Sequence, residues 1–232
     1  MSRRGLAGAP DTRPRGRRRQ VAYAAISALL RYPDEALVRD LPVLEAAAGS
    51  LPAATGGPLR RLIAQLASEP LLDLQAAYVA TFDLHRRCCL YLSYYLNGDT
   101  RRRGIALWRF RDAYRRAGFR LVSGELPDYL PMLLELAASG GHGAENTAVE
   151  LIREHREGIS VLRSALEARE SPYADAVRAL EAVLPPASSS AIADALRLAR
   201  EGPPAELVGL DPAGMVDPYP SQHMTRAEGW DP

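Results

Sequence analysis

The pattern that decides the fold begins in the stretch VAYAAISALLRYP, residues 21–33. Apolar residues recur there every three or four positions, which is the spacing of one face of an α-helix. A proline ends the stretch, because it cannot supply a backbone hydrogen bond inside a helix. The face contains Val21, Ala25, Ala28, Leu29 and Tyr32. The stretch therefore predicts an amphipathic helix whose apolar side is buried.

The same helical spacing of apolar residues continues almost to residue 202. Residues that cap or break helices divide it into separate segments. It predicts further helices over residues 34–48, 58–66, 71–96, 100–117, 127–139, 149–166, 171–184 and 190–201. No sustained segment shows the period of two that is typical of strands. We therefore expect an all-α fold, a single globular domain of about eight or nine helices over residues 21–202. An Arg-rich arm, residues 1–20, and a Pro-rich acidic tail, residues 203–232, are expected to be disordered.

The composition agrees with one ordinary domain. The chain has 232 residues, of which 47% are hydrophobic and 25% charged, as in an average globular protein. These values exclude a collagen, a coiled-coil rod, a disulfide scaffold and a wholly disordered chain. The two cysteines, Cys88 and Cys89, are adjacent, which indicates a reducing compartment. No stretch reaches the roughly 18–20 apolar residues of a membrane span, so we expect a cytoplasmic protein without stable membrane insertion.

Charge is strongly segregated along the chain, although the net charge is +1. Residues 83–120 hold ten arginines and three acidic residues, whereas residues 121–202 hold seven arginines and thirteen acidic residues. The near-neutral total and the acidic second half argue against a nucleic-acid partner, since acidic surfaces repel phosphate.

The sequence contains none of the common catalytic or phosphate-binding motifs. The absence of lysine also excludes Schiff-base chemistry. His85, Cys88 and Cys89 would lie on one face of the predicted helix 71–96, but a structural metal site needs four ligands, and no second Cys/His pair is present. We therefore expect no catalytic residue, no metal site and no cofactor, and we expect the two thiols to be buried.

The most informative region is residues 78–118, where several aromatic residues precede three consecutive arginines, residues 101–103. Three interpretations are open. The aromatic residues could be core, or they could form a groove for an amphipathic peptide helix, since tyrosine has an apolar body and a polar tip. Together with the arginines, they could also bind nucleic acid.

Four stretches resemble one known family. They are YVATFD (78–83), LYLSYY (90–95), GDTRRRG (98–104) and ELPDYLP (125–131). These stretches are similar to the delta-subunit family of respiratory nitrate reductase, the NarJ-type assembly chaperones of the larger TorD-like group. The resemblance is specific over about residues 70–140, and the helix pattern extends it over residues 21–200.

The resemblance implies a chaperone of TorD-like architecture rather than an enzyme. Such proteins bind the N-terminal segment of the apo alpha (catalytic) subunit in the cytoplasm. They assist insertion of the molybdenum cofactor and an iron–sulfur cluster, and they prevent premature membrane docking of the alpha–beta pair. Proteins that deliver the molybdenum cofactor are further expected partners. A chaperone of a different molybdoenzyme and a helical nucleic-acid-binding protein are the alternative hypotheses.

The groove interpretation and the resemblance together name a set of client-binding residues. They are Tyr78, Phe82, Asp83, Arg87, Tyr91, Tyr94, Asp99, Arg101, Arg102, Arg103, Glu125, Pro127, Asp128, Tyr129 and Leu130. Related chaperones carry Glu-x-Pro-Asp-His at the last stretch, and here Tyr129 stands where that His would be.

Two of these residues have an alternative role. Asp128 would stabilise the positive end of its own helix if that helix begins at Pro127. Asp99 would either cap the following helix or pair with Arg102 or Arg103.

Overall fold

All regular structure in the described part of the chain is helical. The computed structural model describes residues 16–121, 124–139, 142–186, 193–194, 197–198 and 200–204. Its α-helices are α1 (Arg17–Leu29), α2 (Glu35–Gly49), α3 (Ala53–Ser68), α4 (Leu71–Tyr78), α5 (Leu92–Asn97), α6 (Arg101–Arg116), α7 (Leu130–Ala138), α8 (His142–Glu154), α9 (Arg156–Glu167) and α10 (Ala174–Val183). A π-helix covers Val79–Asp83 and a 3₁₀-helix covers Arg86–Cys88. The predicted all-α fold is confirmed.

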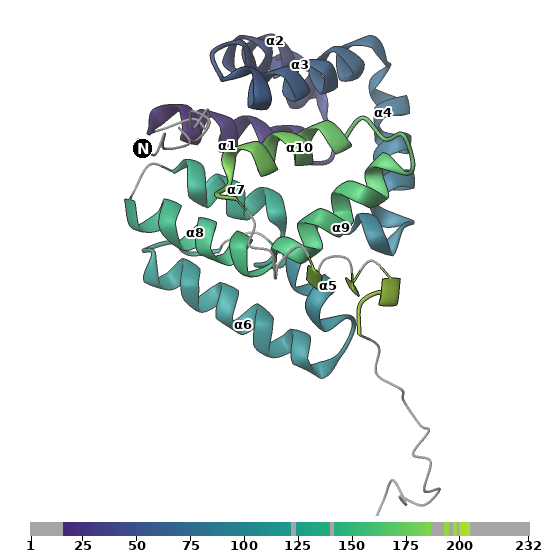
Figure 1. Cartoon of the computed structure of the whole chain (residues 1–232). Helices are drawn as coiled ribbons and strands as arrows, with labels where there is room; N and C mark the ends of the chain where they lie inside the picture. The colour runs from purple at the N-terminus through teal and green to yellow at the C-terminus, as the bar shows by residue number, and fades with distance from the viewer. Residues whose placement is uncertain are drawn as a thin grey trace, which may run out of the picture.

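Helix α1 is the centre of the packing. It contacts α2, α3, α7 and α10, and Figure 1 shows it between the α2–α3 pair above and α7 below. Tyr23, Ile26 and Leu29 of α1 are buried. The Ser27 hydroxyl donates a hydrogen bond to the backbone oxygen of Pro131 in α7 (2.8 Å). The apolar pattern of residues 21–33 therefore forms the helix around which the domain is built.

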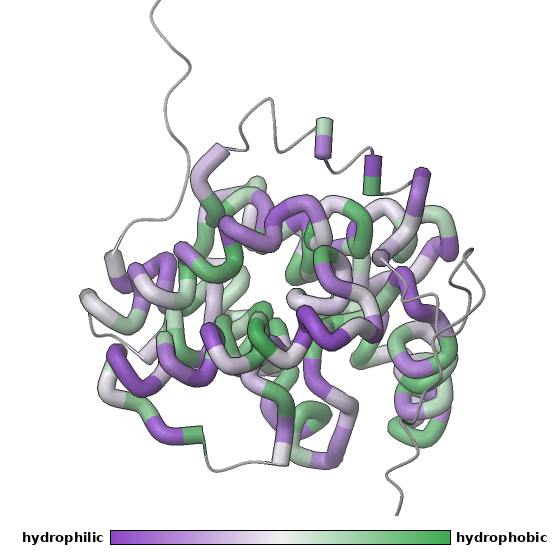
Figure 2. The backbone as a smooth tube through the Cα atoms, turned by 90° about the horizontal axis from the view of Figure 1, so that it is seen from below, coloured by the Kyte–Doolittle hydropathy of each residue, from purple (hydrophilic) through white to green (hydrophobic). Residues whose placement is uncertain are grey.

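The core is shared among the helices rather than contained in one of them. Figure 2 shows hydrophobic and hydrophilic residues interleaved along the whole tube, as expected when each helix contributes one apolar stripe. In α7, the apolar residues at helical spacing are all buried, namely Leu130, Leu133, Leu134 and Ala137.

Three helix starts can be compared with the prediction. Helix α2 begins at Glu35, one residue after the predicted start, and Asp34 caps it, since its Oδ1 accepts a hydrogen bond from the Leu37 N–H (2.8 Å). Helix α1 begins at Arg17 rather than Val21. Helix α3 begins at Ala53, so that Pro58 lies inside the helix and not in its first turn. This earlier start brings the glycine-containing first turns of α3 against the end of α2.

The predicted helix 71–96 is wrong, because this segment is broken into four pieces. Helix α4 passes into the π-helix and then the 3₁₀-helix, before an extended turn leads to α5. The Leu90 oxygen and the Leu92 N–H hydrogen-bond with residues 128–130 instead of within a helix. His85, Cys88 and Cys89 consequently do not share a helical face, and Cys88 is buried whereas Cys89 is half-buried.

The predicted helix 149–166 is interrupted between α8 and α9. His155, which stands between two charged residues in the sequence, is buried. Its ring packs on Phe110 of α6, with ring centres 4.9 Å apart, and its Nδ1 lies 2.8 Å from the Leu151 oxygen. The break therefore brings the imidazole inward, between α6 and the α8–α9 pair.

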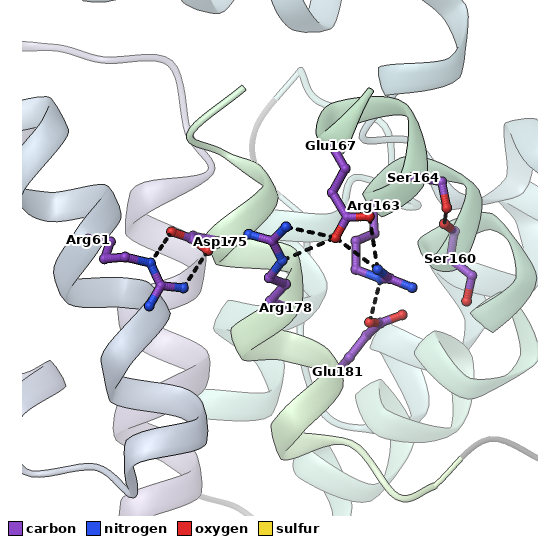
Figure 3. A network of polar contacts seen from close by, with 8 residues as sticks. All are labelled: Arg61, Ser160, Arg163, Ser164, Glu167, Asp175, Arg178 and Glu181. Carbon is purple, nitrogen blue, oxygen red and sulfur yellow. Dashed lines mark hydrogen bonds and ion pairs between the residues drawn. The ribbon is translucent and has the colours of Figure 1, made fainter. Parts of the chain in front are cut away.

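A chain of ion pairs joins α3 to α10 and α9, and Figure 3 shows it from close by. Arg61 donates through two nitrogens to both carboxylate oxygens of Asp175 (2.9 and 2.8 Å). Arg178 links Asp175 to Glu167 (2.8 and 3.0 Å), and Arg163 also pairs with Glu167 (2.8 Å). Burial alone would raise the pKa of Asp175, but the hydrogen bonds from the two arginines outweigh it and lower that pKa.

Some predictions fall outside the described residues. They concern residues 1–15 of the arm, residues 205–232 of the tail, and Ile192, Leu196 and Ala199 of the last predicted helix. None of the helices that the structure describes is long and apolar enough to cross a membrane. The described residues also contain no group of three or more His, Cys, Asp or Glu side chains that could hold a metal ion.

Candidate functional site

A short backbone pairing joins the two segments that carry most of the predicted site residues. Tyr91 and Tyr129 form an isolated antiparallel bridge. On either side of it, the Leu92 N–H donates to the Asp128 oxygen (3.0 Å) and the Leu130 N–H donates to the Leu90 oxygen (2.8 Å). The start of α5 and the start of α7 are thereby held together.

The side chain of Asp128 strengthens this junction. Its Oδ2 accepts hydrogen bonds from the backbone N–H of Ser93 (3.1 Å) and from the Ser93 hydroxyl (2.6 Å). Asp128 is completely buried, and its Oδ1 has no hydrogen-bond partner among the described residues. Because α7 begins at Leu130, Asp128 does not lie in the first turn of its own helix, which corrects that expectation. It instead supplies an acceptor to the first turn of α5.

A line of tyrosine hydroxyls crosses the junction. Tyr78 donates to the Leu30 oxygen (3.0 Å) and lies 3.2 Å from the hydroxyl of Tyr129. The rings of Tyr129 and Tyr91 pack at 5.3 Å, and Tyr91 donates to Glu125 Oε1 (2.7 Å). Burial raises the pKa of all three tyrosines. They therefore stay protonated and can act as hydrogen-bond donors at physiological pH.

Arg103 connects the start of α6 to the same aromatic group. Its guanidinium lies over the rings of Tyr91 (6.0 Å) and Tyr94 (5.7 Å), a distance at which a cation is attracted to the ring face. It also pairs with Asp99 (3.1 Å). Thr100 is the residue that precedes the helix. Asp99 is thus a partner of Arg103 rather than the residue at the cap position.

A pocket opens on one side of this junction, and we call it the α1–α7 pocket. Its volume is about 610 Å³. It is lined by Arg31, Tyr32, Asp34, Tyr114, Phe119, Arg120, Leu121, Glu125, Tyr129, Pro131, Met132, Glu135 and Leu136. Aromatic and aliphatic side chains make up most of the wall, with three carboxylates and two arginines among them. Arg31 pairs with Glu135 (2.8 Å).

The structure sorts the predicted site residues by exposure. The buried ones are Tyr78, Phe82, Tyr94, Pro127, Asp128 and Leu130; the half-buried ones are Tyr91, Arg103, Glu125 and Tyr129; the exposed ones are Asp83, Arg87, Asp99, Arg101 and Arg102. Of all these residues, Glu125 and Tyr129 line the α1–α7 pocket.

Tyr78 and Phe82, two of the predicted client-binding residues, pack inside the domain. Their rings lie 4.6 Å apart, and both pack against the buried ring of Tyr173 just before α10. They fill the space between α4 and α10 and are core residues, which confirms the core interpretation for this pair.

Two exposed aromatic residues of the pocket are not among the residues predicted from the sequence. Tyr32 was assigned to the buried face of the first helix, but its side chain is 49% exposed. Phe119 follows the end of α6 and is 42% exposed. Tyr32 directly precedes Pro33, and Phe119 directly follows Gly118. An aromatic residue beside such a helix-ending residue indicates a surface position, because chain reversals at helix ends leave side chains at the surface.

Comparison with protein families shows to which family this chain belongs. The family described as "Nitrate reductase delta subunit" matches residues 48–179, which is more than half of the chain. The chain belongs to the nitrate reductase delta-subunit family. The match contains both sides of the Tyr91–Tyr129 bridge and Glu125, whereas Tyr32 precedes it.

Individual relatives agree with the delta-subunit assignment. The "Probable nitrate reductase molybdenum cofactor assembly chaperone NarJ" of Bacillus subtilis is 34% identical over 173 residues, 72% of this chain and 89% of the relative. NarJ of Escherichia coli (strain K12), a "Nitrate reductase molybdenum cofactor assembly chaperone", is 36% identical over 157 residues, 66% of this chain and 65% of that protein. The "Nitrate reductase-like protein NarX" of Mycobacterium tuberculosis is 34% identical over 160 residues, and the matched region is 24% of its length.

Proposed function

We propose that this delta-subunit protein is a cytoplasmic assembly chaperone for nitrate reductase and not an enzyme. It binds the N-terminal segment of the apo alpha subunit and assists insertion of the molybdenum cofactor and an iron–sulfur cluster before membrane docking. Proteins that deliver the cofactor are the second class of partner. Membership of the delta-subunit family and the chaperone names of two relatives support this proposal.

The observation that carries the proposal is the position of Glu125 and Tyr129 in the wall of the α1–α7 pocket. These residues belong to the ELPDYLP stretch, and the pocket adds apolar surface from Tyr32 and Phe119 beside them. A short amphipathic helix with basic residues suits this mixture, because its apolar side chains would enter the pocket and a basic side chain would pair with Glu125.

Residues buried behind the pocket act on the client indirectly. Asp128 fixes the start of α5 and the bridge, and the bridge fixes Tyr91 and Tyr129. Asp128 therefore serves as a positioning residue, and the direct contacts fall to Tyr32, Phe119 and Glu125.

The proposal is tested in cells that lack this chaperone and express its own nitrate reductase. Molybdenum bound per purified alpha subunit and nitrate reductase activity are measured after complementation. The wild-type chain should restore both. The variant Tyr32→Ala/Phe119→Ala should restore them less than the control Val43→Ala/Leu72→Ala, whose residues are 69% and 75% exposed and lie outside the pocket.

Two contrary results have different meanings. Full molybdenum loading in the cells that lack the chaperone would contradict the function itself. Full restoration by Tyr32→Ala/Phe119→Ala would leave the chaperone function in place and remove the α1–α7 pocket as the client site.

A further inference from the structure

The outer face of α6 has a composition that neither the core nor the α1–α7 pocket explains. Phe110, Ala113 and Tyr114 form the buried side of this helix. Successive residues turn by 100°, so Ile105 and Trp108 lie on the opposite side, and they are 63% and 64% exposed. In Figure 1, α6 runs along the lower edge of the domain. A large aromatic and a branched aliphatic side chain, one turn apart, are thus presented outward.

Exposed arginines surround this apolar pair. They are Arg101, Arg102, Arg109, Arg111, Arg115 and Arg116. The acidic residue of the helix is Asp112, which pairs with Arg115 (2.8 Å) and Arg116 (3.1 Å). Because Asp112 lies one turn beyond Trp108 on the same side of the helix, the apolar centre of this basic face is the pair Ile105 and Trp108 in the first half of α6.

This pattern is typical of helices that lie in the interface of an anionic membrane. Tryptophan favours the headgroup level because its ring is amphipathic, and arginine binds phosphate oxygens through two parallel hydrogen bonds. A helix of 16 residues is roughly 24 Å long, and its position at the edge of the domain lets a flat surface touch it along its length. Such adsorption needs no helix that crosses the bilayer.

We propose that the outer face of α6 binds the surface of an anionic phospholipid membrane. Trp108 and Ile105 enter the headgroup region, and Arg102, Arg109 and Arg111 contact lipid phosphates. A membrane fits better than nucleic acid, because the centre of the face is apolar and would meet charged backbone on a nucleic acid. This surface is separate from the α1–α7 pocket, so the inference does not depend on the proposed client.

The test uses the full chain and sedimentation with vesicles of equal parts phosphatidylglycerol and phosphatidylcholine. Pure phosphatidylcholine vesicles should bind at least ten-fold more weakly. Because each arginine near an anionic surface contributes about 1 kcal/mol, Arg102→Gln/Arg109→Gln/Arg111→Gln should lower partitioning roughly hundred-fold. The control Arg39→Gln/Arg60→Gln/Arg153→Gln removes the same charge from exposed arginines outside α6, and it should change partitioning by less than about three-fold.

Tryptophan fluorescence reports whether Trp108 itself enters the interface. The chain has two tryptophans, so Trp230→Phe leaves Trp108 as the only tryptophan. Its emission should shift to shorter wavelength with the anionic vesicles. Three results would each overturn the proposal. The first is an unshifted emission in bound protein, and the second is an equal effect of the triple α6 variant and the triple control variant on partitioning. The third is no vesicle binding together with α6-dependent binding of transfer RNA.

Discussion

The carboxylate of Asp128 accepts two hydrogen bonds from Ser93, a residue 35 positions earlier in the chain. This pair joins α5, which begins within the LYLSYY stretch, to the ELPDYLP stretch, and the Tyr91–Tyr129 bridge lies beside it. The two stretches that carry the family resemblance are therefore one structural unit. The first consequence is for stability.

Asp128→Ala should destabilise the domain by about 2–3 kcal/mol, because the Ser93 N–H and hydroxyl lose their acceptor in a buried place. Asp128→Asn keeps an acceptor oxygen and should cost less. The midpoint of urea unfolding measures both. Glu150→Ala, at an exposed position, is the control and should stay within about 0.5 kcal/mol. An unchanged midpoint for Asp128→Ala would show that the buried carboxylate does not hold α5.

Gly158→Ala should destabilise the domain by roughly 1–3 kcal/mol through overpacking. A Cβ atom at Gly158 of α9 would lie 2.7–2.8 Å from the Tyr95 Cβ, Cγ and Cδ2 atoms. Tyr95 cannot move easily, since it is buried and its hydroxyl donates to the Arg87 and Cys89 oxygens (3.0 and 2.8 Å). The unfolding midpoint should therefore fall.

Gly104→Ala is the matched control, because a Cβ there meets nothing within 4 Å. In this helical position alanine should stabilise by about 0.5–1 kcal/mol. The two substitutions thus have opposite predicted signs, and a shared sign would contradict the packing argument.

Features that depend on residues close together in the sequence could be predicted, whereas features that depend on distant residues could not. The helical segments and some inward positions, such as Ala25 and Leu29, could be predicted, because the spacing of apolar residues is a local property. The exact face could not, since Tyr32 is exposed and Tyr23 is buried. The breaks at residues 79–91 and at His155 could not be predicted either, because each depends on a distant partner, residues 128–130 in one case and Phe110 in the other.

The same reasoning applies to the candidate site. The sequence named Glu125 and Tyr129, but it left open whether Tyr78 and Phe82 belong to the same site or to the core. Tyr32 and Phe119 come from the ends of different helices, and their proximity at the α1–α7 pocket is set by the packing of α1, α6 and α7. No pattern within either segment encodes that arrangement.

His155 gives a prediction for pH dependence. Burial lowers its pKa below the ordinary value of 6.5, although Glu154, Asp128 and Glu157 act in the opposite direction. The unfolded chain then binds the proton more readily than the folded chain, so stability is fully present above about pH 6.5 and falls as the pH drops through this value.

Comparison with His155→Gln isolates this contribution from the other titrating groups. The unfolding free energy of the wild type should decrease more steeply between pH 7 and pH 5 than that of the variant. Equal slopes would show that His155 is not kept neutral by its burial.

The most direct test of the chaperone account is isothermal titration of this protein with a peptide from the N-terminus of its own nitrate reductase alpha subunit. We predict saturable one-to-one binding that is lost with a scrambled peptide. The affinity should fall at least ten-fold in Tyr32→Ala/Phe119→Ala, since aromatic anchors dominate such contacts, and it should be unchanged in Val43→Ala/Leu72→Ala. Absence of binding, or equal affinity for the scrambled peptide, would contradict the central claim that this protein recognises that client segment.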